Sequence, residues 1–369
     1  MAGCLLAYLH VGPEACPVPV SRPMRIAIRR LSLEQERSAL IQFLRRYLTP
    51  HSAEHRFAWL YLENPNGNAQ VWVAEDSTSG ELVGASAVFP KRLHLDGKET
   101  LGFVFGDFCI HPGYRSLGPA VQLQRACLEQ MSLEIRTIGY DFPGAGMLPV
   151  HRRLGRQPED RLVRLAKPLR VDRKISEKVP RGGIARTLSA VGNGVLGWSD
   201  RWRSVPARAE IAWHQGRCGE EFSALAAKTA PRTGITTART ATYLNWRYLD
   251  HPIRHFDILT ARRDGVLMAC AVVTRDAEDA CIVDLFGMEE REVLTGLLCH
   301  AVESLRSLDI VTVSAHLLAS HPWLRLFARL GFVQRDSSPV IFYRAGGGGG
   351  FAGKAPAPGW FLMDGDRES

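Results

Sequence analysis

A short segment near residue 115 carries the residue types with the clearest chemical meaning. It follows an apolar run at 103–110, precedes an amphipathic run that contains Leu123, Cys127 and Met131, and reads Arg115-Ser116-Leu117-Gly118-Pro119-Ala120. Glycine allows a ligand to approach the backbone closely. The free amides at a helix start, at the positive end of the helix dipole, bind phosphate. We therefore predict a strand, a phosphate-binding turn and a helix, with Arg115 adding positive charge.

Two stretches of the chain repeat each other. Trp59-Leu60-Tyr61-Leu62-Glu63-Asn64-Pro65 reappears 187 residues later as Trp246-Arg247-Tyr248-Leu249-Asp250-His251-Pro252. Two apolar runs separated by a turn follow each copy, and in the second copy the turn is Asp264-Gly265, a strong hairpin signal. Both halves then show strand, helix, strand, helix and strand patterns. This order predicts an α/β protein with a mixed sheet, built from two tandem, related domains.

The composition indicates a globular protein that can bury more than one core. The chain has 369 residues, 46% hydrophobic and 23% charged, which suits two domains. No apolar run approaches the roughly 20 residues that span a bilayer, and the start lacks the features of a signal peptide. The eight cysteines form no CxxC pair, which is typical of buried thiols in a reducing cytoplasm. We therefore expect a cytoplasmic protein, and predict these segments: an extension at 1–23, a first domain at 24–165, a basic connector at 166–212, a second domain at 213–345 and a flexible Gly/Pro-rich tail at 346–369.

Positive charge is concentrated near the connector. Residues 152–186 contain twelve Arg or Lys and four Asp or Glu, while the whole chain has a net charge of +8. Such a run is usually a solvated linker, and the alternative is a site for an anionic partner. An apolar set at helical spacing, interrupted by glycines, follows: Ile184, Leu188, Val191, Val195 and Leu196. That helix either packs against both domains or lies on a membrane surface.

The phosphate-binding segment resembles motif A of the GNAT superfamily, the general-control-type N-acetyltransferases. The motif has the form V-x-P-x-x-R-x-x-G-x-G/A, and this chain has Ile110-His111-Pro112-Gly113-Tyr114-Arg115-Ser116-Leu117-Gly118-Pro119-Ala120. A second motif, Tyr140-Asp141-Phe142-Pro143-Gly144 followed by His151-Arg152-Arg153-Leu154-Gly155, is similar to the late strand and helix of that family. The resemblance covers 24–165 well and 210–345 in weaker form.

The resemblance implies acetyl-CoA as co-substrate and an amine that attacks the thioester directly. The pantetheine is expected on the backbone of Cys109, Ile110 and His111, and the pyrophosphate on the amides of 115–120, where Pro119 lacks one donor. Asp107 is the candidate base for the ammonium proton, with a structural acid as the alternative, because it lies on the Cys109 side of the strand. His151 stands where the family often has a Tyr that protonates the thiolate, and the alternative is a surface histidine.

The second half lacks the acyl-CoA motif. At the corresponding position it has Glu289 and Glu290, which would repel phosphate, and Phe327 replaces His151. We predict that this half binds no acyl-CoA and completes the substrate cleft as an internal dimer partner, so the chain could act as a monomer.

Three functions remain open from the sequence. The first is an N-acetyltransferase for a small-molecule or glycan amine such as an amino sugar. The second is a peptidoglycan-type aminoacyltransferase, and the third is a non-catalytic scaffold. His51 and His55, with Glu54 beside them, could form a metal-binding pair on a helix. No third ligand is apparent, so no metal is predicted.

Overall fold

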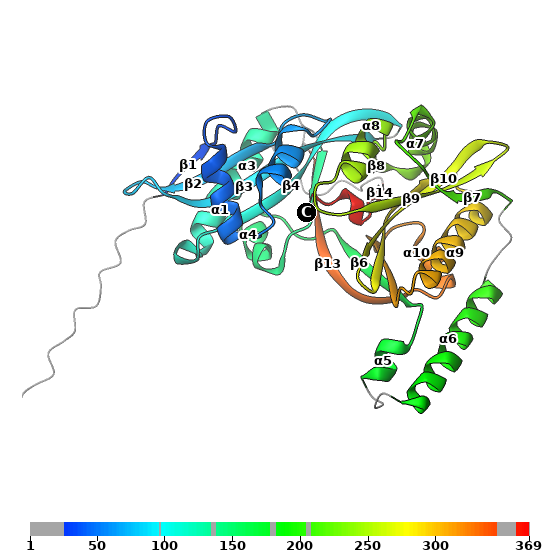
Figure 1. Cartoon of the computed structure of the whole chain (residues 1–369). Coiled ribbons are helices and arrows are strands. Elements are labelled where there is room, and N and C mark those ends of the chain that lie inside the picture. Colours follow the sequence, from blue (N-terminus) through cyan, green and yellow to red (C-terminus); the bar gives the residue numbers. More distant parts are fainter. Residues whose placement is uncertain are drawn as a thin grey trace, which may run out of the picture.

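The computed structural model describes residues 26–95, 97–133, 138–177, 182–203, 208–344 and 359–368. The predicted extension at 1–23 and the Gly- and Pro-rich part of the predicted tail lie outside these ranges. Helices and strands are interspersed along the described chain (Figure 1), in agreement with the predicted α/β fold class.

Fourteen strands form the described sheet structure. Their bounds are β1 Ile26–Arg30, β2 Gln70–Asp76, β3 Leu82–Leu95, β4 Lys98–Ile110, β5 Ile138–Asp141, β6 Asp160–Pro168, β7 Glu210–Trp213, β8 Ile235–Thr237, β9 Phe256–Arg263, β10 Val266–Asp276, β11 Asp279–Gly287, β12 Thr312–Leu318, β13 Val333–Arg344 and β14 Trp360–Phe361. We call β1–β6 the first half and β7–β13 the second half.

Helices cover the sheet and link its strands. The α-helices are α1 Arg37–Tyr47, α2 Glu54–Phe57, α3 Leu117–Leu133, α4 Leu148–Arg153, α5 Asp172–Ser176, α6 Gly183–Arg203, α7 Glu220–Thr233, α8 Ala241–Leu244, α9 Arg291–Ser307 and α10 Leu324–Arg329. The other helical turns are η1 Ala58–Leu62, η2 Pro112–Tyr114, η3 Ala145–Met147, η4 Asn245–Leu249 and η5 Asp364–Asp366. In the described part of the chain, none of these helices combines the length and apolar character that crossing a membrane demands.

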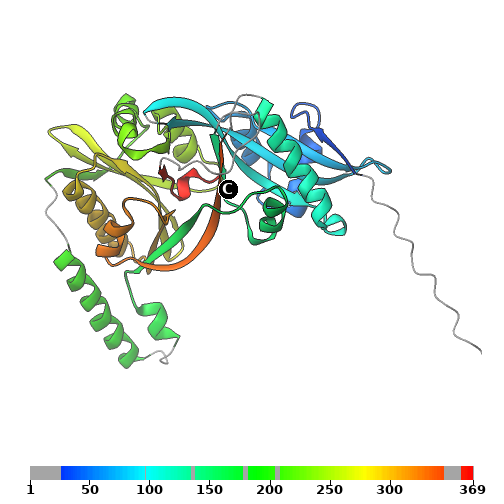
Figure 2. The ribbon, with the colours of Figure 1, turned by 180° about the vertical axis from the view of Figure 1, so that it is seen from behind.

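The two halves exchange their last strands. The sheet order is β1-β2-β3-β4-β5-β13-β6-β12-β11-β10-β9-β7, so β13 of the second half pairs with β5 of the first. In return, β6 pairs with β12 of the second half and lies beside β13. Figure 2 shows β6 and β13 crossing the middle of the molecule between the halves. The halves therefore share one continuous sheet.

The sequence repeat is a repeat of local geometry. The two tryptophan segments both form one wide π-helical turn after a short helix, η1 after α2 and η4 after α8. The predicted hairpin turn joins β9 and β10, where Asp264 and Gly265 have φ angles of 51° and 77°. Positive φ at both central residues matches the right-handed twist of the flanking strands.

Candidate functional site

A cavity of about 770 Å³ opens where β4 and β5 separate. These parallel strands pair only at Phe103–Gly139 and Val104–Tyr140. Beyond those pairs the cavity lies between the end of β4, from Phe105 to Ile110, and the segment from Asp141 to Gly144. Backbone groups left unpaired by separated strands can bind an extended ligand. The cavity therefore has one wall suited to amide pairing, which includes two of the predicted residues, Cys109 and Ile110. The third, His111, does not line the cavity, and its amide donates to the Val83 carbonyl at 2.8 Å.

The predicted phosphate-binding segment borders this cavity. Helix α3 begins at Leu117, and Arg115, Ser116 and Ala120 line the cavity. Arg115 donates from Nε to the carbonyl of Ile110 at 3.3 Å, and the residue is exposed. Pro119 lies in the first turn of α3, where amide groups have no intrahelical acceptor, so the proline removes one of four available donors. The structure thus brings the predicted loop and the predicted backbone wall to one cavity.

Asp107 lies in a β-bulge of β4 and is held by three donors. Its φ is 47°, and the register with β3 shifts here, which interrupts the side-to-side alternation used to predict its orientation. Both guanidinium Nη atoms of Arg56 donate to the carboxylate, at 2.9 and 3.0 Å, and the Tyr61 hydroxyl donates at 2.6 Å. The Asp107 side chain is 6% exposed. Three donors on one buried carboxylate favour the structural alternative for this residue.

The second half contains the same arrangement without a phosphate-binding loop. Asp284 accepts two hydrogen bonds from Arg239, both at 2.9 Å, and one from the Tyr248 hydroxyl at 2.8 Å. Tyr248 is the repeat partner of Tyr61. An arginine–tyrosine clamp on an aspartate in or next to a β-bulge is therefore common to both halves, which again points to a structural role.

His151 is completely buried and does not line the cavity. The alternative of a surface histidine is therefore wrong, because α4 turns this side chain inward. Its Nε2 lies 3.1 Å from Asp141 Oδ2 without hydrogen-bond alignment, and its Nδ1 lies 3.4 Å from the Tyr343 hydroxyl. Asp141 does line the cavity. His151 therefore lies behind Asp141, a residue of the quoted strand motif for which the sequence predicts no catalytic role.

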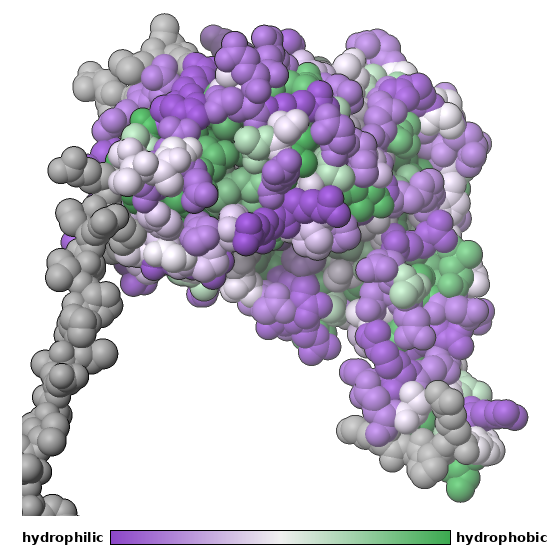
Figure 3. Space-filling view, turned by 60° about the vertical axis from the view of Figure 1, so that its left-hand side comes forward, coloured by the Kyte–Doolittle hydropathy of each residue, from purple (hydrophilic) through white to green (hydrophobic). Residues whose placement is uncertain are grey.

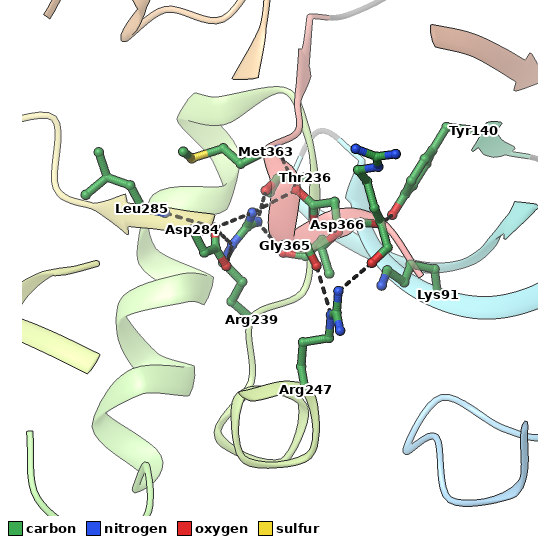
Figure 4. A network of polar contacts seen from close by, with 12 residues as sticks. Lys91, Tyr140, Thr236, Arg239, Arg247, Asp284, Leu285, Met363, Gly365 and Asp366 are labelled. Carbon is green, nitrogen blue, oxygen red and sulfur yellow. Dashed lines mark hydrogen bonds and ion pairs between the residues drawn. The ribbon is translucent and has the colours of Figure 1, made fainter. Parts of the chain in front are cut away.

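The end of the described chain forms another wall of the cavity. Arg367 and Glu368 line it, and Glu368 is ion-paired with Lys91, both side chains being fully buried. Arg247 donates from Nε to the Gly365 carbonyl at 3.0 Å, and the Tyr140 hydroxyl donates to the Asp366 carbonyl at 2.9 Å (Figure 4). The apolar residues 360–363 pack in the core. This apolar run is the sequence signal that the end of the chain docks on the protein and so places Arg367 and Glu368 at the cavity.

The same segment fills the gap between β11 and β12 in the second half. Met363 forms a β-bridge with Leu317. A side chain at Gly365 would lie 2.1 Å from the Tyr248 hydroxyl and 3.1 Å from the Val283 carbonyl, so only glycine fits here. Asp366 completes a buried network with Arg239 and Asp284 (Figure 4). The position that corresponds to the first-half cavity is thus occupied by the protein itself.

Acidic residues stand before α9, at the place of the phosphate-binding loop. Glu290 is the N-cap residue, and it pairs with Arg263 at 2.7 Å. Phe327 is fully buried. These features support the prediction that the second half binds no acyl-CoA.

Cys109 lines the cavity as a buried thiol. Burial, with a smaller contribution from the nearby Asp107 carboxylate, raises its pKa to about 12. A thiol with that pKa stays protonated near neutral pH, and the thiolate is the nucleophilic form. The cavity therefore offers no activated cysteine at this position.

One group of described residues has the donor types of a metal site. Ligand atoms of Cys281, His316 and Asp364 lie within 4.8 Å of one another. The positive charges of Arg164 and Arg367 act on His316, and burial lowers the pKa of this histidine. Nearby guanidinium groups oppose the binding of a cation.

Comparison with solved structures identifies the fold. A GCN5-related N-acetyltransferase from Anabaena variabilis has a TM-score of 0.63 and 14% identity, over 87% of this chain and 73% of that one. A tandem GNAT protein from the clavulanic acid biosynthesis pathway has a TM-score of 0.54 and 16% identity, over 87% of this chain and 99% of that one. The N-myristoyltransferase of Saccharomyces cerevisiae, with bound myristoyl-CoA and inhibitors, has a TM-score of 0.56 and 12% identity, over 89% and 81%.

These similarities confirm the predicted fold class, a tandem pair of GNAT-like units with a mixed sheet. Neither a protein-family model nor a curated protein matches the sequence.

Proposed function

On the tandem GNAT fold that this chain shares with its structural neighbours, we propose an acetyl-CoA-dependent N-acetyltransferase whose cofactor site lies in the first half. The observation that carries the proposal is the cavity between β4 and β5, which reaches from the unpaired strand backbone to Arg115 and the start of α3. The strand backbone from Phe105 to Ile110 suits an extended pantetheine, and the end of the cavity at Arg115 suits a pyrophosphate. The acceptor is an amine on a small molecule or a glycan.

Asp141 is our candidate for the group that receives the ammonium proton. Three carboxylates belong to residues that line the cavity: Asp107, Asp141 and Glu368. Asp107 already has three donors, and the Glu368 side chain is fully buried against Lys91. The Asp141 side chain is 12% exposed, the most of the three. A base must reach the proton that it abstracts.

The reaction then proceeds by direct transfer. Asp141 takes a proton from the ammonium group, and the neutral nitrogen attacks the thioester carbonyl carbon. The new C–N bond forms, the C–S bond breaks, and a second proton passes from the nitrogen to the departing thiolate. His151 takes no direct part, since its ring does not reach the cavity and lies behind Asp141, with Nε2 3.1 Å from Oδ2.

Calorimetry with acetyl-CoA tests the cofactor site. The native chain should bind with micromolar affinity. Arg115→Ala removes a charged donor, and Gly118→Asp places a carboxylate at the phosphate site, so each should weaken binding about 10-fold or more. Arg291→Ala, at the start of α9, is the matched control and should bind as the native chain does. Absence of binding to the native chain would refute the proposal.

Thiol release from acetyl-CoA with a panel of amines tests turnover. Asp141→Asn should lower kcat roughly 100-fold or more, while the affinity for acetyl-CoA stays unchanged. A thermal melt of the variant checks that the fold is intact. Full turnover by Asp141→Asn would remove Asp141 from the mechanism and leave the cofactor site standing.

A further inference from the structure

Helix α6 carries a stripe of largely exposed apolar side chains, and Trp198 at the end of the stripe also lines a pocket of about 360 Å³ between α6 and α9. The exposed residues are Ile184, Leu188, Val191, Val195 and Trp198, with exposed fractions of 74%, 47%, 61%, 59% and 63%. Their spacing of four, three, four and three residues places them on one side of the helix. Figures 1 and 2 both show α5 and α6 projecting from the body of the molecule.

The opposite side of α6 is polar and is attached to the second half and to α5. Asn193 Oδ1 accepts a hydrogen bond from the Val171 amide at 2.8 Å. Asp200 pairs with Lys167 at 2.6 Å and also with Arg306. An isolated helix would normally bury its apolar side against the protein. Here, rotation to that orientation would break these polar contacts, so the apolar stripe is held outward.

The segment that carries the stripe has a net positive charge. Residues 170–203 contain eight Arg or Lys and three Asp or Glu. Arg186 and Arg201 lie on α6 itself, Lys174 lies on the adjacent α5, and all three are exposed. Figure 3 shows this projection at the lower right, with hydrophobic residues among hydrophilic ones.

From this geometry we infer that α6 docks on the surface of an anionic lipid bilayer. An amphipathic helix with an apolar side that contains Trp, Leu and Val, and with basic residues beside it, binds in the interface region of a membrane. Anionic lipids attract the arginines and lysines, and the apolar stripe leaves water. A second copy of this chain would instead bring two positively charged connectors together. Charge complementarity therefore favours the lipid surface, and the helix lies on the bilayer without crossing it.

Vesicle sedimentation with the full-length chain tests this inference. Vesicles of phosphatidylcholine mixed with phosphatidylglycerol should pull the protein down, and vesicles of phosphatidylcholine alone should leave it in the supernatant. Leu188→Glu and Val195→Glu each place a charge in the stripe and should weaken binding about 10-fold or more. Val195→Leu keeps the stripe apolar and should bind vesicles as the native chain does. Higher salt should reduce binding, because the attraction to the headgroups is screened.

The matched control is Val266→Glu, at an equally exposed valine (59%) on the β9–β10 hairpin. It should bind vesicles as the native chain does, and circular dichroism should show all variants folded. Failure of the native chain to sediment with anionic vesicles would overturn the inference, as would equal binding by Leu188→Glu. If light scattering shows a dimer that Val195→Glu dissociates, and vesicles are not bound, the stripe is a contact between copies and the lipid inference is wrong.

Discussion

Trp59 and Trp246 exchange hydrogen bonds across the boundary between the two halves. The indole Nε1 of Trp59 donates to the Trp246 carbonyl at 2.8 Å, and Nε1 of Trp246 donates to the Trp59 carbonyl at 3.0 Å. Their rings are stacked, with centroids 4.9 Å apart and planes at 20°. The two contacts are reciprocal, as expected for residues related by a pseudo-two-fold axis. The sequence repeat therefore has a direct structural function: its copies join the halves.

Removing either tryptophan should destabilise the whole chain. Trp59→Ala and Trp246→Ala each empty a buried site and should lower the free energy of unfolding by about 3–5 kcal/mol. The double variant should lose less than the sum, because both residues serve one shared contact. Urea denaturation followed by circular dichroism measures these values. Val266→Thr, at an exposed position, should change stability by less than about 0.5 kcal/mol. Strict additivity of the two core substitutions would contradict the reciprocal contact.

The two clamped aspartates should respond differently to neutralisation. Asp107→Asn leaves the buried Arg56 without its counter-charge, which should lower stability by about 3–5 kcal/mol, whereas Asp284→Asn leaves Arg239 paired with Asp366 and should cost less. Acetyl-CoA affinity should change little in either variant, as measured by calorimetry below the melting temperature. If Asp107→Asn abolishes turnover while it remains as stable as the native chain, then Asp107 is the catalytic base and its structural role is wrong.

Cys109 should be dispensable for acetyl transfer. Because its pKa is raised to about 12, only roughly one thiol in ten thousand is ionised at pH 8. Cys109→Ala should therefore retain most of the turnover, and intact-mass spectrometry of the native protein with acetyl-CoA should show no acetylated form. A mass increase of one acetyl group that disappears in Cys109→Ala would establish a covalent route instead.

Stability should fall with acid because of His321. Burial lowers the pKa of this histidine from 6.5 to about 3, so the folded protein resists protonation that the unfolded chain accepts. The unfolded state then binds more protons between pH 6.5 and 3, and the free energy of unfolding decreases as pH falls through that window. Between pH 6.5 and 5 the loss should be about 2 kcal/mol.

His321→Asn isolates this effect. The asparagine Oδ1 can accept the hydrogen bond that His321 Nδ1 accepts from the Trp323 amide at 3.1 Å, and it does not titrate. Urea denaturation at several pH values should give a flatter profile for this variant. His255→Asn, whose native side chain is 81% exposed, should keep the native slope. Parallel profiles for the native chain and His321→Asn would show that another group controls acid stability.

Local signals in the sequence predicted the elements of this site but not their final contacts. The hairpin at Asp264-Gly265 and the tryptophan repeat depend on neighbouring residues, and each lies in the predicted element. The predicted turn at 115–120 is shorter in the structure, because α3 already begins at Leu117 and includes Gly118. The predicted orientation of the Asp107 side chain assumes strict alternation of side chains along the strand, and the β-bulge interrupts this alternation. A one-residue insertion in the register leaves no clear mark in a sequence of apolar residues.

The sequence by itself determined the tandem α/β pattern and the position of the phosphate-binding turn, because periodicity and turn chemistry act over a few residues. Only the tertiary structure decided which parts of the chain form the walls of the cavity between β4 and β5. The strand exchange brings Tyr343 of β13 to His151, and the end of the chain brings Glu368 to Lys91. These partners lie 192 and 277 residues apart. Contacts at such separations follow from how whole strands pair and bury their apolar sides, and this depends on the packed chain as a whole.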